Sequence, residues 1–345
     1  MKDIPNLDFV RSVAVISVVV SHLLLALHIM QAGPFPTAPL GVLGVMLFFV
    51  LTSLVLMWSL ERRPHTLDFY IRRWFRIYPL AWVVLAVALL FHAPTGGTPQ
   101  SIFLFTALDR KDIVNQFSLL PIFAANAPVL VGPMWSLPYE IMMYLLLPIL
   151  YFFVRKNFSL WPLLLAWALI LLNTRRTPNH NFGTAIGYFL PGVMAYVAFG
   201  RWKPVLPGWT LPLFLLVLWA VFIPHFSFHG MWEFCLIVGL GLPLFRQIDQ
   251  EWILAPSRQI AKYSYGIYLT HMFGLVVGIR LLSAHSLPVQ VLAVVLSTAV
   301  LSLLGYHLIE HPMIRLGSRL ASRAESRYEQ HEMKQLRELP STVNP

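Results

Sequence analysis

The chain contains few charged residues and almost no cysteine. Asp, Glu, Lys and Arg make up 12% of its 345 residues, hydrophobic residues make up 57%, and the mean hydropathy is +0.68. Soluble domains carry about 25% charged residues, so this composition excludes a water-soluble globular fold. The single cysteine, Cys235, excludes an intramolecular disulfide and a thiolate metal cage, and no His-rich or Asp-rich spacing indicates another metal site. We therefore predict a membrane protein that holds no metal.

Acidic residues are scarcer than basic ones, with 15 Asp and Glu against 25 Lys and Arg. Ten apolar runs separate the basic residues, most of them close to the length of a transmembrane helix. The runs cover residues 7–30, 40–60, 77–92, 135–154, 159–173, 183–200, 209–224, 230–246, 261–283 and 289–311. The predicted fold is an all-α polytopic bundle of about ten transmembrane helices. Residues 1–316 form its membrane domain and 317–345 a charged cytoplasmic tail, and the long connection 93–134 has room for a re-entrant or interfacial helix.

The distribution of Lys and Arg predicts the orientation in the membrane. Most basic residues outside the runs fall on the side of the two termini, whereas the opposite side holds Arg110, Lys111, Arg175 and Arg176. The positive-inside rule then places both termini in the cytoplasm. This topology accounts for the net charge of +10, and we expect no nucleic-acid partner. The first run is too long for a signal peptide and lacks a cleavage pattern, so we expect it to be a permanent helix.

The first apolar run carries Asp8, Arg11 and His22, which are costly in lipid. At about 100° per residue, the step from Arg11 to His22 closes three turns with roughly 20° left over, so both lie on one helix face about 16 Å apart. Ionisable residues inside a membrane usually face a bundle interior or a wet cavity and mark a functional site. The alternative is a histidine that merely packs between helices.

Three arginines cluster before the third run, in the segment FYIRRWFRIYP at 69–79. On a helix Arg72, Arg73 and Arg76 are neighbours. With the flanking aromatic residues they could anchor the segment among anionic head groups. A second interpretation is a phosphate clamp, because the planar guanidinium binds phosphate in bidentate fashion.

Glu140 ends the segment GPMWSLPYE at 132–140, about 7 Å below the outer surface. His22 lies at a comparable depth, so the two side chains can meet if their helices are neighbours. A carboxylate beside an imidazole fixes its tautomer and stabilises its charged form. The alternative for Glu140 is a structural ion pair with an arginine.

Three further segments carry weaker signals. Gly41 and Gly44 permit close approach between helices. Ser264, Tyr268 and His271 recur at helical spacing, a stripe that usually hydrogen-bonds neighbouring helices. Glu310 is placed to pair with an arginine, and Pro312 is expected to end the tenth helix.

In their joint order these motifs resemble the acyltransferase 3 family, the bacterial integral-membrane O-acyltransferases that act on carbohydrates. The resemblance covers about residues 6–316, and its motifs are LDFVR at 7–11 followed by His22, GVMLFFVLTS at 44–53, RRWFRIYP at 72–79, WSLPYE at 135–140 and SYGIYLTH at 264–271. Two positions depart from the family pattern: Met46 stands where Asp is frequent, and Thr52-Ser53 replaces the usual Ser-Gly. These departures favour a variant acceptor or donor.

The resemblance implies transfer of an acyl group, commonly acetyl, from cytoplasmic acyl-coenzyme A to a carbohydrate hydroxyl, often on a surface or secreted glycan, by an enzyme of the bacterial inner membrane. His22 matches the family's essential histidine, and Arg11, Arg73 and Arg76 match its functional arginines. We expect Arg72, Arg73 and Arg76 to hold the coenzyme's phosphates, with Arg11 as a further coenzyme-binding residue or as a stabiliser of the oxyanion. His22 is the expected base or acyl carrier, and Glu140 is expected to orient its ring or the sugar. We also expect the hydrolase-like domain of some relatives to be missing.

A transporter or flippase is the competing interpretation, because a bundle with intramembrane charges also fits that class. Transporters are commonly built from internal repeats with matching broken helices. The two halves of this chain show no convincing correspondence, which favours the enzyme.

Overall fold

The chain is almost entirely helical in a computed structural model that describes residues 4–98, 101–120, 128–154, 158–176 and 182–338. The α-helices are α1 (Pro5–Ala26), α2 (Ala38–Arg62), α3 (Thr66–Leu90), α4 (Arg110–Ser118), α5 (Leu137–Phe153), α6 (Leu160–Arg176), α7 (Phe182–Arg201), α8 (Leu211–Phe222), α9 (Phe228–Gly241), α10 (Glu251–Leu275), α11 (Leu287–Leu304) and α12 (His311–Glu338). Tighter 3-10 turns are η2 (Gly132–Ser136), η3 (Gly208–Thr210) and η4 (Leu242–Leu244), and wider π-helical segments are η5 (Val276–Leu281) and η6 (Gly305–Glu310). The short strands β1 (Gln31–Ala32) and β2 (Phe35–Pro36) pair antiparallel between α1 and α2.

Each of the ten apolar runs falls on a helix, which confirms the all-α class. Among the described residues, five helical stretches are long and apolar enough to cross a membrane, namely 5–26, 38–62, 66–90, 132–153 and 287–325. The apolar helices at 160–174, 208–222 and 229–244 are shorter. The chain is therefore a helical membrane protein, and the number of ten spans stays a prediction. Lys2, Arg155 and Lys156, which are among the basic residues assigned to the side of the termini, lie outside the described residues.

Two helix boundaries differ from those expected. α3 begins at Thr66, before the run predicted from residue 77, so the arginine motif is part of the helix. The expectation that Pro312 ends the last helix is wrong, because α11 continues through η6 into α12 as far as Glu338. Proline lacks an N–H and clashes with the carbonyl four residues earlier. The wider π-helical turn that precedes Pro312 makes room for the proline ring and relieves this clash.

The connection 93–134 contains the short helix α4, whose first turn is capped by the Asp109 carboxylate, which accepts from the Asp112 amide at 2.7 Å. The expectation that this connection holds a re-entrant or interfacial helix stays a prediction.

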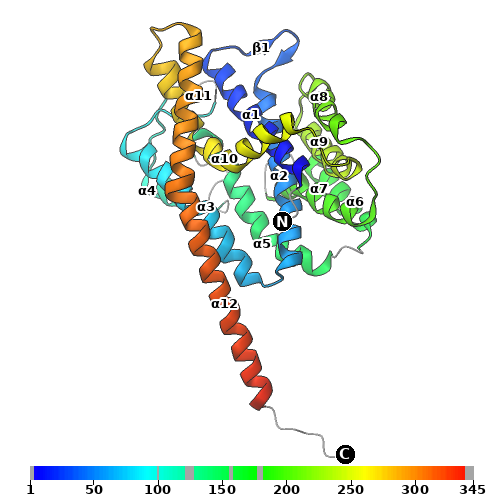
Figure 1. Ribbon diagram of the computed structural model, residues 1–345. Coiled ribbons are helices and arrows are strands. Elements are labelled where there is room, and N and C mark those ends of the chain that lie inside the picture. The colour runs from blue at the N-terminus through cyan, green and yellow to red at the C-terminus, as the bar shows by residue number, and fades with distance from the viewer. Residues whose placement is uncertain (1–3, 99–100, 121–127, 155–157, 177–181, 339–345) are drawn as a thin grey trace, which may run out of the picture.

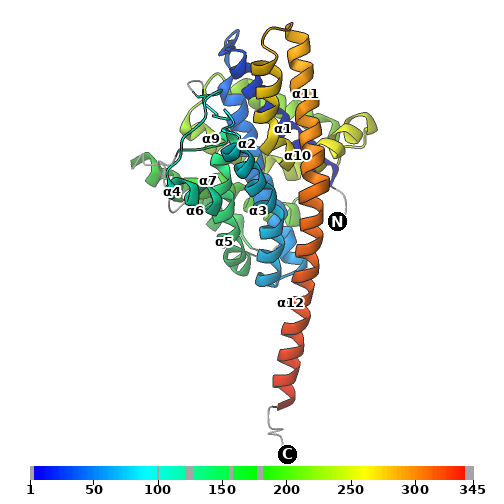
Figure 2. The same ribbon diagram turned by 90° about the vertical axis from the view of Figure 1, so that its left-hand side faces the viewer.

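The bundle is built around α2, which packs against α1, α5, α7 and α9, while α1 also packs against α10. The hairpin β1–β2 and the turn before α11 lie at one end of the molecule, and the α2–α3 turn lies at the other (Figures 1 and 2). From that second end α12 projects beyond the other helices (Figure 1), and it packs along α3 before it leaves the bundle. The tail was predicted to begin at residue 317, but no helix boundary lies there, because α12 continues through this position to Glu338. Residues 339–345 lie outside the described part of the chain.

Gly44 allows α1 and α2 to touch. A Cβ at this position would lie 2.7 Å from the Ala14 carbonyl oxygen, a backbone atom that cannot turn aside. We expect Gly44→Ala to force the two helices apart, and overpacking of this kind costs about 1–3 kcal/mol. The measurement is the thermal unfolding midpoint of the purified protein in detergent. In the control variant Gly305→Ala, the nearest atom is the flexible Leu80 Cδ1 at 3.1 Å, and equal midpoints for the two variants would contradict the contact.

Candidate active site

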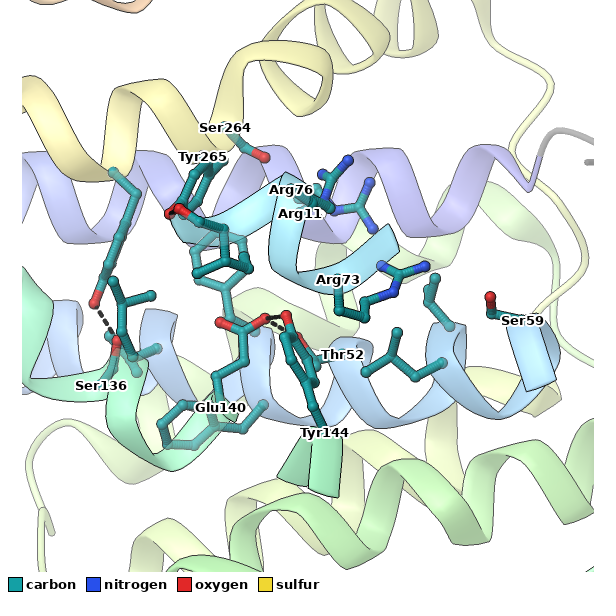
Figure 3. Close-up of a pocket in the computed structure, with 18 of the residues that line it drawn as sticks. Arg11, Thr52, Ser59, Arg73, Arg76, Ser136, Glu140, Tyr144, Ser264 and Tyr265 are labelled. Carbon is teal, nitrogen blue, oxygen red and sulfur yellow. Dashed lines mark hydrogen bonds between the residues drawn. The ribbon is translucent and has the colours of Figure 1, made fainter. Parts of the chain in front are cut away.

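A cavity of about 360 Å³ lies among α1, α2, α3, α5 and α10. On α2 its lining extends from Val45 to Arg62, which is about 25 Å at 1.5 Å per residue. Figure 3 shows Ser136 and Ser59 at its opposite ends. The polar lining residues are Arg11, Thr52, Ser59, Arg62, Arg73, Arg76, Ser136, Glu140, Tyr144, Ser264, Tyr265 and Tyr268. The cavity is thus long and narrow, and it reaches the end of α2 next to the α2–α3 turn.

The charge in this cavity is mostly positive. Arg11, Arg62, Arg73 and Arg76 line it, against the single carboxylate Glu140. Two of these arginines have a carboxylate nearby: Arg11 Nη1 lies 3.9 Å from Asp8, and Arg76 Nη2 lies 3.9 Å from the buried Glu310. Such an excess of guanidinium groups around one cavity attracts anions, and the planar fork of arginine matches the geometry of phosphate.

Arg73 contributes a buried guanidinium to the cavity. Its guanidinium lies 5.8 Å from the centre of the Phe69 ring. Within the described structure its buried Nε has no hydrogen-bond partner. Figure 3 shows the Arg73 side chain extending from α3 into the cavity, with its guanidinium turned toward the end where Ser59 lies.

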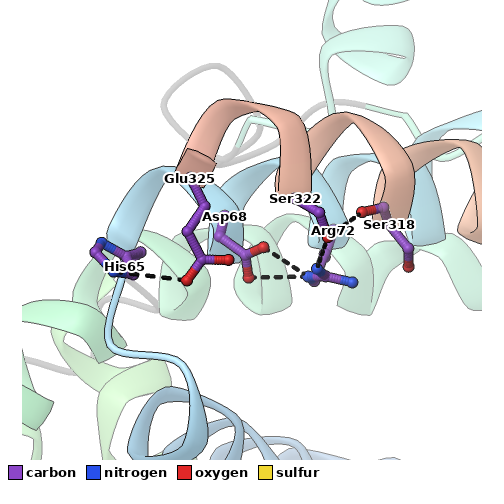
Figure 4. Close-up of polar contacts among 6 residues, drawn as sticks. All are labelled: His65, Asp68, Arg72, Ser318, Ser322 and Glu325. Carbon is purple, nitrogen blue, oxygen red and sulfur yellow. Dashed lines mark hydrogen bonds and ion pairs between the residues drawn. The ribbon is translucent and has the colours of Figure 1, made fainter. Parts of the chain in front are cut away.

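Arg72 does not line the cavity, unlike its neighbours Arg73 and Arg76. Its Nε donates to both carboxylate oxygens of the buried Asp68, at 2.9 and 2.8 Å, and its Nη2 donates to Ser322 of α12 at 3.4 Å (Figure 4). Successive residues on a helix point about 100° apart, which is why adjacent arginines face different neighbours. Of the three arginines expected to bind phosphate, Arg73 and Arg76 line the cavity and Arg72 does not, and Arg11 and Arg62 line it as well. Arg62 lies outside the predicted arginine motif and was expected only among the basic residues on the side of the termini.

Glu140 faces the cavity, held by two hydroxyl groups. Tyr144 Oη and Thr52 Oγ1 both donate to its Oε1, the latter at 3.4 Å. The expected meeting with His22 does not occur, because α1 packs against α2 and α10 while α5 lies against α2. Glu140 is therefore part of the arginine cavity, and it does not orient the imidazole ring.

His22 instead pairs with a second histidine. Its Nδ1 lies 3.0 Å from the Val18 carbonyl oxygen and 3.3 Å from Nε2 of His271, and the ring centres are 5.1 Å apart. His22 is half-buried, whereas His271 is completely buried. On the sequence His271 belongs to the polar stripe of α10 that was expected to hydrogen-bond neighbouring helices, and its contact with His22 of α1 is of that kind. The signal in the sequence was its position three residues after Tyr268, which places both side chains on the same face of α10.

The histidine pair lies just beyond one end of the cavity. Tyr268 lines that end, and its ring centre lies 6.3 Å from that of His271. The Tyr268 hydroxyl lies 2.7 Å from Ser136 Oγ and 2.6 Å from the Pro133 carbonyl oxygen. The cavity thus has arginines along its length and, at the end away from the α2–α3 turn, a tyrosine that separates it from the two histidines.

Comparison with known proteins settles the family. The family described as an acyltransferase domain, acyltransferase 3, matches residues 4–307. The chain belongs to the acyltransferase 3 family. The matched part of this acyltransferase includes every residue that lines the cavity and both histidines. The motifs and the site therefore lie in one acyltransferase domain.

Three curated relatives are similar to this acyltransferase. It is 27% identical over 318 residues to the peptidoglycan O-acetyltransferase OatA of Listeria monocytogenes, an alignment that covers 78% of this chain and 49% of OatA. It is 26% identical over 315 residues to Nodulation protein 10 of Rhizobium leguminosarum bv. viciae, covering 81% and 84% of the two chains. It is 31% identical over 129 residues to the acyltransferase MdmB of Streptomyces mycarofaciens, covering 34% and 30%. The chain spans about half the length of OatA, and no solved structure matches it.

The two departures from the family pattern lie in different surroundings. Met46 is buried in the core and does not line the cavity. Thr52 does line it, and its hydroxyl contacts the carboxylate of this acyltransferase, Glu140. Of the two, the change at Thr52 therefore bears directly on the site.

Proposed function

We propose that this acyltransferase moves an acetyl or other acyl group from cytoplasmic acyl-coenzyme A to a hydroxyl of a carbohydrate on a surface or secreted glycan. The relative OatA is named for O-acetylation of peptidoglycan, which supports a glycan acceptor. The observation that carries the proposal is the cavity itself, which is lined by four arginines and ends at Tyr268. The Tyr268 ring lies 6.3 Å from that of His271, whose ring in turn lies 5.1 Å from that of His22.

The shape and charge of the cavity support a coenzyme donor. Coenzyme A carries phosphate groups at one end of a long flexible arm and the acyl thioester at the other. In the proposal Arg73, Arg76 and Arg11 bind the phosphates, with Arg62 at the entrance, and the arm follows α2 toward Ser136 and Tyr268. Glu140, held by Tyr144 and Thr52, balances part of the arginine charge.

His22 is the proposed base. Its imidazole accepts the proton of the acceptor hydroxyl as that oxygen attacks the thioester carbonyl, the carbon–sulfur bond breaks, and coenzyme A leaves as the thiol after taking up a proton. In the covalent variant the imidazole attacks the thioester carbonyl, the carbon–sulfur bond breaks and coenzyme A leaves as the thiolate. The sugar oxygen then attacks the acyl carbon, the carbon–nitrogen bond breaks, and the hydroxyl proton goes to the released imidazole. The half-buried ring of His22 is reached by the acceptor from the side opposite the arginines.

The same geometry supports the proposed orientation in the membrane. Arg62 lies at the end of α2 next to the α2–α3 turn, on the side where the positive-inside rule places the cytoplasm. In a bacterial inner membrane with both termini cytoplasmic, the entrance of the cavity faces the compartment that contains acyl-coenzyme A.

The test is transfer of radiolabelled acetyl groups by purified protein in lipid vesicles. We expect label to move from acetyl-coenzyme A to an added glycan fragment, and only when the donor is on the side of the C-terminal tail. Vesicles without protein are the control. Flux of intact glycan with no labelled product at any donor concentration would overturn the proposal in favour of a transporter.

A further inference from the structure

The histidine pair forms a short hydrogen-bonded chain whose direction can be assigned. His271 Nδ1 lies 3.1 Å from the Ile267 carbonyl oxygen. A carbonyl oxygen can only accept, so the hydrogen must be on Nδ1 of His271. A neutral imidazole carries one N–H, and Nε2 of His271 therefore presents a lone pair.

The same reasoning applies to His22. Its Nδ1 faces the Val18 carbonyl oxygen at 3.0 Å and the His271 lone pair at 3.3 Å. Both neighbours are acceptors, so Nδ1 of His22 carries the hydrogen and shares it between them. Nε2 of His22 is then the unprotonated nitrogen.

The opposite assignment leaves bad contacts. If Nε2 of His271 carried the hydrogen and donated it to Nδ1 of His22, the carbonyl oxygens of Val18 and Ile267 would each face a nitrogen lone pair. Such contacts are costly at a residue as buried as His271, whose exposed fraction is 0%. The surroundings of the pair thus select one tautomer for each ring.

We propose that His271 is a positioning residue that fixes the tautomer and the ring orientation of His22, so that Nε2 of His22 is the atom that accepts the proton. The partner on the other ring nitrogen decides which nitrogen of a histidine is free. When Nε2 takes up the proton, the Nδ1–H of the charged ring still donates to His271, which accepts without changing its own protonation. This inference rests on the proposed function, and it assigns to His271 one of the two roles expected of Glu140, the orientation of the imidazole ring.

The test compares two substitutions of the buried histidine. His271→Gln places an amide oxygen near the position of Nε2 and can still accept from His22, whereas His271→Leu fills the space without an acceptor. We expect kcat to fall about 100-fold in the leucine variant, which is the lower end of the range that a positioned general base contributes. In the glutamine variant we expect kcat to fall less than about tenfold. KM for acetyl-coenzyme A should change little in either, since His271 does not line the donor cavity.

A spectroscopic measurement tests the same point without activity. In ¹⁵N-histidine-labelled wild-type protein, the signals that disappear in His22→Gln identify His22, and we expect Nδ1 to be the protonated nitrogen and Nε2 the bare one. His271→Leu should convert this into a mixture of tautomers, and His271→Gln should preserve it. A wild-type His22 protonated at Nε2, or a folded leucine variant with unchanged kcat and unchanged tautomer, would overturn the inference. Because the spectrum needs no turnover, it decides the role of His271 even if the proposed reaction fails in its own assay.

Discussion

His22→Ala is expected to lower acyl transfer by between about 100-fold and 10,000-fold, the range that a positioned general base contributes. Alanine removes the nitrogen that accepts the proton and leaves the donor cavity intact, because His22 is not part of its lining. We therefore expect kcat to fall while the affinity for coenzyme A stays within a few-fold of the wild-type value. The measurement is the rate at which labelled acetyl reaches a glycan fragment, together with equilibrium binding of coenzyme A.

A matched control for this substitution is His285→Ala, which removes an exposed histidine in the turn before α11. It should leave both the rate and the binding unchanged. Wild-type rates in the His22→Ala protein would contradict the assignment of the base.

His22→Ala also distinguishes direct transfer from transfer through an acyl-histidine. If the acyl group passes through His22, labelled acetyl-coenzyme A without an acceptor should leave label on the wild-type protein and none on His22→Ala. Direct transfer predicts no protein-bound label in either.

The second large effect is expected at Arg73. Arg73→Gln removes a guanidinium whose Nε has no hydrogen-bond partner in the described structure, inside the cavity that we propose for the phosphates. Hydrogen bonds to charged groups contribute about 1.5–3 kcal/mol, so we expect coenzyme A to bind roughly 10- to 100-fold more weakly. The measurement is calorimetric titration with coenzyme A. Acetyl-pantetheine, which lacks the phosphates, should be used as a substrate equally well by wild type and variant.

The adjacent arginine provides the control. Arg72 pairs with the buried Asp68, outside the cavity, so Arg72→Gln is combined with Asp68→Asn to avoid leaving an unpaired buried carboxylate. This double variant should bind coenzyme A within about threefold of wild type, as expected for side chains that do not contact the ligand. Equal weakening by both variants would show that the phosphates do not bind where the cavity lies.

Much of the fold could be read from local features of the sequence. The scarcity of charge identified a membrane protein, and the ten apolar runs located helices that are all present. The errors lay at boundaries, where local rules compete. Proline was expected to stop the last helix at Pro312, but a π-helical turn allows it to continue.

The candidate site could be predicted in its residue types, but its pairings could not. Helical periodicity identified Arg11, His22, Arg73 and Arg76 as unusual, and the order of the motifs indicated the acyltransferase 3 family, which the comparison confirmed. The same periodicity grouped Arg72 with the arginines of the cavity, although Asp68 and α12 draw it away.

The sequence by itself determined the class of protein, the helices, the family and the angular position of each polar residue on its own helix. Only the tertiary structure decided that His22 of α1 faces His271 of α10, and that Glu140 of α5 faces Thr52 of α2. The physical reason is that periodicity defines the direction in which a side chain points, whereas the helix that lies in that direction depends on packing between distant segments. Close contacts such as Gly44 against Ala14 determine that packing, and they bring residues 249 positions apart within hydrogen-bonding distance.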